Sequence, residues 1–276
     1  MPPEGDWVAL SEYLTYLRRL NQDVRLKGVY AWILGSSYNT SGANQMSGKP
    51  ASPQWVARLV NGAGVSADRD ESAVGVVRTN NPQGRVLLGA VAPWRDEANG
   101  SVPFSIHTPS LNYFYTLLLA LADATQSAGQ VGGWSLLPDG FAVQAPGTPS
   151  LSPAHPALEP QTDLRDPHTQ AQMGFRVYQD WQAVINAVPA TQGLPIYITA
   201  TNTFEFATDQ PPAQNYPPGW LTHALAEIAH NPQIHALCWF MDDLAGDAQW
   251  QFFSLTQGQG QLQFANTEFD ALLGGE

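Results

Sequence analysis

The 276-residue sequence contains one cysteine, Cys238, and only two lysines, Lys27 and Lys49. A single cysteine cannot form an intrachain disulfide, and it excludes a metal site built from several cysteines. Acidic residues outnumber basic ones by 24 to 12, which gives a formal net charge of -12. Because no basic patch is available for a phosphate backbone, we expect neither nucleic acid nor an anionic membrane as a partner.

Long apolar runs are also missing, since no stretch approaches the roughly 20 apolar residues of a membrane span. The first six residues lack the basic and apolar regions of a signal peptide, so a cytoplasmic location is the default expectation. The six histidines are scattered, without an HExxH motif or a His-x-His pair. We therefore predict no metal site and no cofactor.

Helical and strand patterns alternate along the chain. Short apolar runs rich in strand-forming residues predict buried strands at residues 27–34, 85–92, 139–145, 194–199 and 234–241. Apolar periodicity predicts helices at residues 6–20, 52–60, 110–124, 171–188, 219–229 and 261–273. This alternation predicts an α/β fold with a parallel sheet, in which functional sites lie at the C-terminal ends of the strands.

Four segments at the predicted strands read Trp32-Ile-Leu-Gly-Ser-Ser-Tyr-Asn39, Asp139-Gly-Phe-Ala-Val-Gln144, Ile198-Thr-Ala-Thr-Asn202 and Cys238-Trp-Phe240. In this order and spacing they resemble the TIM-barrel glycoside hydrolases of the retaining clan. The resemblance covers the chain from Gly28 onward, and it implies that the five predicted strands correspond to strands four to eight. The fold class is then an α/β fold of the (β/α) TIM-barrel type, partial or open. Residues 1–276 would form one domain that lacks the first three strands.

The resemblance also implies where a catalytic pair would stand. The family's acid/base glutamate follows strand four and its nucleophile ends strand seven, and the matching positions here are Ser37 and Ala200. Retaining hydrolysis needs two carboxyl groups roughly 5–5.5 Å apart, and neither serine nor alanine supplies one. Ser36 and Gln144 replace a further asparagine and histidine of the family pattern. We therefore predict a glycoside-hydrolase-like module without catalytic activity.

Relocated acids are the basis of an alternative hypothesis, an active glycosidase. Glu205 lies five residues after Ala200, Asp96 and Glu97 follow the second predicted strand, and Asp242 follows the last one. Two of these carboxylates facing each other across a strand-end cleft would permit hydrolysis. Surface charge and helix capping are the simpler explanations for the aspartates and for Glu97.

Carbohydrate binding is the function expected of such a module, because stacking on a sugar ring requires no carboxylate. The candidate binding residues near strand ends are Tyr38, Asn39, Trp94, Asn202, Phe204 and Trp239. Trp239 lies inside a predicted strand, where a core position is the simpler explanation.

The number of predicted strands indicates a second role, in assembly. Five strands leave both edges of a parallel sheet open, whereas a closed barrel of this kind has eight. We expect a second copy or a partner chain to cover these edges. A third hypothesis is a structural protein that retains the scaffold only for protein contacts.

Overall fold

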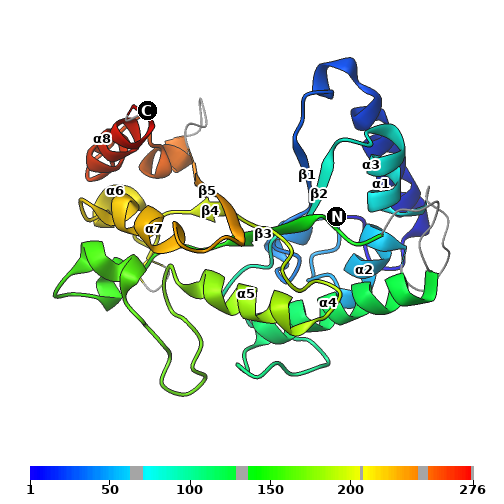
Figure 1. Ribbon diagram of the computed structural model, residues 1–276, viewed down its shortest axis with the longest axis horizontal. Helices are drawn as coiled ribbons and strands as arrows, with labels where there is room; N and C mark the ends of the chain where they lie inside the picture. The colour runs from blue at the N-terminus through cyan, green and yellow to red at the C-terminus, as the bar shows by residue number, and fades with distance from the viewer. Residues whose placement is uncertain (63–70, 129–135, 206–207, 242–247, 275–276) are drawn as a thin grey trace. The chain divides into compact units, whose positions relative to one another are not determined.

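The computed structural model describes residues 1–62, 71–128, 136–205, 208–241 and 248–274. In these residues five strands form one sheet in the order β1-β2-β3-β4-β5 (Figure 1). The strands are β1 (Ala31–Leu34), β2 (Arg85–Leu88), β3 (Gly140–Gln144), β4 (Ile196–Thr201) and β5 (Ile234–Trp239). The registered pairs β1–β2, β2–β3 and β4–β5 are parallel. Each predicted run overlaps one strand, so the predicted α/β fold with a five-stranded parallel sheet is confirmed.

Helices separate the strands along the chain. The six predicted helices correspond to α1 (Trp7–Gln22), α2 (Pro53–Asn61), α4 (Pro109–Ala128), α5 (Val177–Ala187), α7 (Trp220–Ile228) and α8 (Leu262–Leu273). Two helices that the sequence analysis did not predict are α3 (Ala73–Asn80) and α6 (Pro212–Asn215). The connections contain the 3₁₀ turns η1 (Val24–Leu26), η2 (Gly42–Asn44), η4 (Pro149–Leu151), η5 (Pro156–Gln161) and η6 (Ala248–Phe253).

Helix α2 shows how local sequence sets the ends of an element. Ser52 Oγ accepts a hydrogen bond from Trp55 N at 3.2 Å, and Pro53 occupies the first turn, where its missing N–H costs nothing. Gly62 follows the last turn with a φ of +79°, a left-handed conformation that glycine adopts without a steric penalty. The helix between these caps is buried along most of its length and packs against α4.

The chain divides into two compact units. The first contains residues 1–142 and 182–195, and the second contains residues 143–181 and 196–276. That residues 1–276 form one domain stays a prediction. In the first unit, the Asp139 carboxylate accepts hydrogen bonds from Arg78 Nη2 at 2.6 Å and from Val86 N at 2.8 Å. Since Arg78 lies on α3 and Val86 on β2, this charge-assisted pair holds the helix beside the strand.

The second unit has an aromatic core centred on Trp220, the first residue of α7. Its ring lies edge-to-face on Phe175 at 5.4 Å, on Trp239 at 6.4 Å and on Tyr216 at 6.5 Å between centroids. Edge-to-face contacts of this kind add to the free energy gained from burying the rings. The core therefore joins α7 to the end of β5.

A buried carboxylate, Glu159 in η5, ties the loop after β3 to this core. Its Oε2 accepts the Trp220 indole N–H at 2.7 Å, and its Oε1 accepts Phe175 N at 2.8 Å. Burial raises the pKa of Glu159 above its ordinary value, although these donors favour the charged form. A Cβ on Gly174 would lie 1.9 Å from Glu159 Oε1, so the carboxylate fits only beside a glycine. Glu159 is not among the residues predicted from the sequence.

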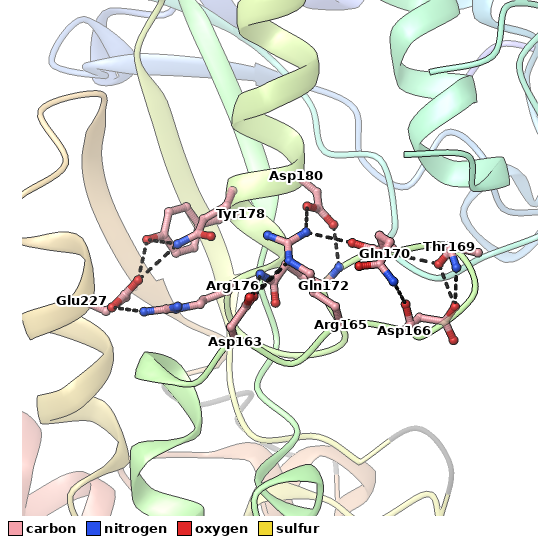
Figure 2. Close-up of polar contacts among 12 residues, drawn as sticks. Asp163, Arg165, Asp166, Thr169, Gln170, Gln172, Arg176, Tyr178, Asp180 and Glu227 are labelled. Atoms are coloured by element: carbon pink, nitrogen blue, oxygen red, sulfur yellow. Dashed lines mark hydrogen bonds and ion pairs between the residues drawn. The ribbon is translucent and has the colours of Figure 1, made fainter. Parts of the chain in front are cut away.

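Figure 2 shows a polar network that anchors the end of the same loop to α5. Asp180, in the first turn of α5, is buried and accepts a hydrogen bond from Gln172 N at 2.7 Å. Arg165 Nη1 lies 3.8 Å from its carboxylate. Burial, the largest effect, raises the pKa of Asp180 to about 6. A second ion pair, between Arg176 Nη2 and Glu227 Oε2 at 2.9 Å, joins the loop to α7.

Candidate functional site

The carboxyl ends of β3, β4 and β5 surround a pocket in the second unit, with a volume of about 270 Å³. Gln144 is the last residue of β3, Ala200 lies near the end of β4, and Asn202 follows β4 directly. The residues lining this aromatic pocket are Gln144, Pro146, Ala200, Asn202, Phe204, Phe240, Trp250 and Phe253. Parallel strands bring their carboxyl ends to one edge of the sheet, which is why segments far apart in sequence meet here.

Four rings form the wall of the aromatic pocket. The centroid of Phe253 lies 5.3 Å from that of Trp250 and 5.5 Å from that of Phe204. Phe240 contacts Trp250 at 5.8 Å with the planes nearly perpendicular, at 84°. These spacings are typical of favourable aromatic pairs, so the rings hold one another in place. Phe204 was predicted from its position after a strand, whereas the sequence analysis did not predict a binding role for Phe240, Trp250 or Phe253.

Asn202 and Trp239 position this wall through hydrogen bonds to the backbone. Asn202 Oδ1 accepts Phe204 N at 2.9 Å, and its Nδ2 donates to the Phe240 carbonyl at 3.3 Å. The Trp239 indole N–H donates to the Phe253 carbonyl at 3.2 Å. Asn202 therefore holds two of the ring-bearing segments at the β4 and β5 ends, while Trp239 holds the third.

None of the described residues that line the aromatic pocket carries a carboxylate. Ala200, where the sequence resemblance led us to expect the nucleophile position, contributes a methyl group, and Gln144 contributes an amide. Such a surface can contact an uncharged ring and hydrogen-bond one of its polar groups, but it supplies neither a nucleophile nor a proton donor. Because Asp242 lies outside the described residues, the structure assigns it no place.

Glu205, the alternative nucleophile nearest to Ala200 in sequence, has its carboxylate engaged in a hydrogen bond outside the aromatic pocket. Its side chain is buried and accepts a hydrogen bond from the Ser150 hydroxyl. Its backbone forms an isolated antiparallel bridge with Gln210. It is not among the residues that line the aromatic pocket. These contacts tie Glu205 to Ser150 and Gln210.

The predicted acids of the first unit lie in an exposed loop. Asp96 and Glu97 are both exposed, and Glu97 accepts hydrogen bonds from Ser41 Oγ at 2.6 Å and from Ser41 N at 2.7 Å. The Ser41 hydroxyl and backbone amide lower the pKa of Glu97, which therefore stays ionised near neutral pH. A carboxylate of this kind is a poor general acid.

The two serines after β1 belong to the first unit. Ser36 is exposed, and Ser37 has a φ of +51° and donates its backbone N–H to Ala90 O at 2.6 Å. Trp94, in the loop after β2, is half-buried and also has a positive φ, of +54°. That Ser36 and Ser37 are vestigial catalytic positions stays a prediction, and so does the binding role of Trp94.

Tyr38 and Asn39 are core residues, contrary to the expectation that they face a ligand. The side chains of both are 0% exposed. Asn39 Nδ2 donates to Ala92 O at 2.9 Å, and Asn39 Oδ1 accepts Ala92 N at 2.8 Å. Tyr38 turns back against Gly35, where an added Cβ would lie 2.6 Å from its Cε1. The loop after β1 folds inward, and a strand-end position in the sequence does not reveal that direction.

Trp239 also departs from the predicted set of binding residues. It is 9% exposed, packs edge-to-face on Tyr216 at 5.8 Å, and does not line the aromatic pocket. It is a core residue that supports the pocket wall through Phe253.

In the described residues, no group of three or more His, Cys, Asp and Glu side chains is arranged to hold a metal ion. None of the helices in these residues is long and apolar enough to cross a membrane.

The sequence matches no protein-family model and no curated protein. Among solved structures, the chain is similar to a GH128 (subgroup II) endo-beta-1,3-glucanase from Pseudomonas viridiflava, at 12% identity and a TM-score of 0.50. That match covers 92% of this chain and 73% of the glucanase. A GH128 (subgroup II) endo-beta-1,3-glucanase from Sorangium cellulosum matches at 13% identity and a TM-score of 0.48, over 88% of this chain and 74% of that one. At these identities the likeness concerns the fold alone. The chain therefore has a partial, TIM-barrel-like α/β fold of the kind found in glycoside hydrolases.

Proposed function

We propose that this chain is a non-catalytic, glycoside-hydrolase-like module that binds carbohydrate in the aromatic pocket. The observation that carries the proposal is the composition of the pocket wall. Four aromatic rings and the Gln144 amide converge at the strand ends, and no described lining residue has a carboxylate. A glycoside-hydrolase-like fold supports the choice of a sugar as ligand, by analogy of fold.

The chemistry of the aromatic pocket suits a sugar ring. The C–H faces of a pyranose are apolar and pack on aromatic rings, while its hydroxyl groups form hydrogen bonds with amides such as that of Gln144. Ligand pockets are typically roughly 300–1,000 Å³, and a volume of about 270 Å³ lies just below that range. We therefore infer that the pocket takes one ring at the end of an oligosaccharide.

The similar solved structures direct the choice of ligand. Because they are endo-beta-1,3-glucanases, a short β-1,3-linked glucose oligosaccharide is the first compound to test. We also propose that Ser36, Ser37, Gln144 and Ala200 are vestiges of a retaining active site.

Hydrolysis and binding assays together test this function. We expect no release of nitrophenol from a panel of nitrophenyl glycosides and no shortening of β-1,3-glucose oligosaccharides, whereas calorimetric titration detects binding. Ala200→Phe, which fills the aromatic pocket at a half-buried position, should abolish the binding signal and leave the thermal melt cooperative. Turnover that persists after repurification would contradict the inactive module and support a glycosidase with relocated acids.

A further inference from the structure

The sheet that the described residues form has two outer strands, and each has a paired strand on one side only. Among the described residues, β1 pairs with β2 and β5 pairs with β4, and each lies at an end of the strand order. An exposed strand edge presents a row of unpaired N–H and C=O groups and is a template for pairing with another chain. Parallel strands of this kind are normally buried on both faces.

Exposed apolar side chains gather on the first and last elements of the chain. Among the described residues, fifteen large hydrophobic side chains are exposed. Six of them lie between residues 7 and 33, on α1, η1 and β1 or directly before β1, and they are Trp7, Val8, Tyr16, Val24, Tyr30 and Ile33. Five lie after β5 or on η6 and α8, and they are Phe240, Phe252, Phe264, Leu272 and Leu273. Eleven of the fifteen thus belong to β1, to the elements before it or to the segment after β5. Exposed apolar side chains that lie together are characteristic of protein interfaces.

The segment that precedes β1 and the segment that contains β5 carry net charges of opposite sign. Residues 18–30, directly before β1, carry Arg18, Arg19, Arg25 and Lys27, against one acid, Asp23. Lys27 and Arg19 are exposed. In contrast, residues 177–276 contain neither lysine nor arginine and include ten acids. Two of these acids, Glu268 and Asp270, lie on α8. A β1 edge would therefore attract a β5 edge and repel another β1 edge.

We propose that a second copy of this chain associates head to tail, with its β5 edge on the β1 edge of the first copy. This arrangement pairs the basic end with the acidic end and buries exposed apolar side chains of both, apart from Phe240, which lines the aromatic pocket. It also continues a parallel sheet, in which the next strand is added in the same direction. An interface between two different surfaces of identical chains is heterologous, in contrast to one that pairs β1 with β1.

The molar mass in solution tests the association. We expect light scattering and sedimentation velocity at micromolar concentration to give at least twice the monomer mass of 29.9 kDa. The mass should fall in high salt, because screening weakens the attraction between the charged ends. A monomer at every concentration and salt would overturn the proposal, and would favour a different partner chain.

Charge variants test the head-to-tail arrangement. Ile33→Glu places an acid on the β1 edge, and Leu273→Arg places a cation beside the acidic end, so each variant alone should be monomeric. Both side chains are exposed, at 48% and 67%, and circular dichroism should show native folding. Met46→Glu, which changes a side chain that is 73% exposed but lies on neither edge element, is the matched control and should associate normally.

Mixing the two monomeric variants provides the decisive result. In the head-to-tail arrangement the new glutamate of one copy meets the new arginine of the other, while the remaining pair of edges is unaltered. The mixture should therefore recover the wild-type mass. If the mixture stays monomeric while the controls associate, the two edges do not meet and the proposal is wrong.

Discussion

The Trp239 indole nitrogen lies 3.2 Å from the carbonyl oxygen of Phe253 and donates a hydrogen bond to it. Trp239 ends β5 and is buried against Tyr216 and Trp220, whereas Phe253 ends η6 and lines the aromatic pocket. A core residue that does not line the pocket thus holds one of its walls. The shape of the proposed binding site depends on the aromatic core behind it.

Trp239→Phe should test this coupling, because it keeps an aromatic ring and removes the indole donor. We expect the free energy of unfolding to fall by about 1–3 kcal/mol, from the lost hydrogen bond and the smaller ring. The affinity for sugar should fall severalfold, since Phe253 loses its anchor. Chemical denaturation and calorimetric titration measure the two effects. Trp7→Phe, an exposed tryptophan of the first unit, is the matched control and should leave the affinity unchanged.

Trp250→Ala should remove the largest ring of the aromatic pocket. We expect the dissociation constant for a β-1,3-glucose oligosaccharide to rise about tenfold, which corresponds to about 1.4 kcal/mol of lost stacking. Phe252→Ala is the matched control, because Phe252 is close in sequence and 43% exposed but does not line the pocket. Equal losses of affinity in the two variants would show that the pocket wall is not the binding surface.

Asp180→Asn should change how stability depends on pH. The pKa of Asp180 is raised from 3.8 to about 6 in the folded chain, chiefly by burial. An acid with a raised folded pKa contributes stability below its unfolded pKa and loses that contribution as pH rises through its folded pKa. Urea denaturation should therefore show that the free energy of unfolding of the variant increases relative to that of the wild type as the pH rises from 4 to 7. A constant difference across that range would mean that Asp180 ionises normally in the fold.

Gly174→Ala should be strongly destabilising. The added Cβ would lie 1.9 Å from Glu159 Oε1, and the buried carboxylate has little room to move because Phe175 N and the Trp220 indole bind it. We expect a loss of more than about 2 kcal/mol, as for other overpacked sites. Gly28→Ala is the control, since no atom lies within 4 Å of its added Cβ and its φ is not in the left-handed region. Similar thermal melts for the two variants would contradict the close packing around Glu159.

The strands could be predicted from sequence because buried parallel strands are continuous apolar runs. The run at residues 234–241 contains β5, and the run at residues 85–92 contains β2. Helix α3 was not predicted, although Ser72 caps its first turn by accepting a hydrogen bond from Gly75 N at 3.1 Å. This helix of eight residues contains three valines and a glycine, so it has low helix propensity, and tertiary packing has to stabilise it.

The candidate site could be predicted only in part. Gln144, Ala200, Asn202 and Phe204 were identified because they end or follow strands, and the structure brings these four together in the aromatic pocket. The ring of Trp250 comes from a 3₁₀ turn, which has no apolar periodicity to mark it. The aromatic residues between 250 and 253 could have been identified as candidates, because they closely follow the last predicted strand. Functional sites in such folds lie at the C-terminal ends of the strands.

The inward turn after β1 could not be predicted. Tyr38 is buried against Gly35, three residues earlier, whereas Asn39 is held by Ala92, which lies far away in sequence. Position after a strand places a residue at the correct edge of a sheet but does not fix the direction of its side chain.

A saturation-transfer NMR experiment on a β-1,3-linked glucose hexasaccharide, followed over a day, tests the central claim most directly. It observes binding and the integrity of the sugar in one sample. The proposal predicts transfer to the ring C–H protons of the sugar, loss of that transfer in Ala200→Phe, and an unchanged hexasaccharide. The appearance of shorter sugars, or transfer of equal strength in Ala200→Phe, would contradict non-catalytic binding in the aromatic pocket.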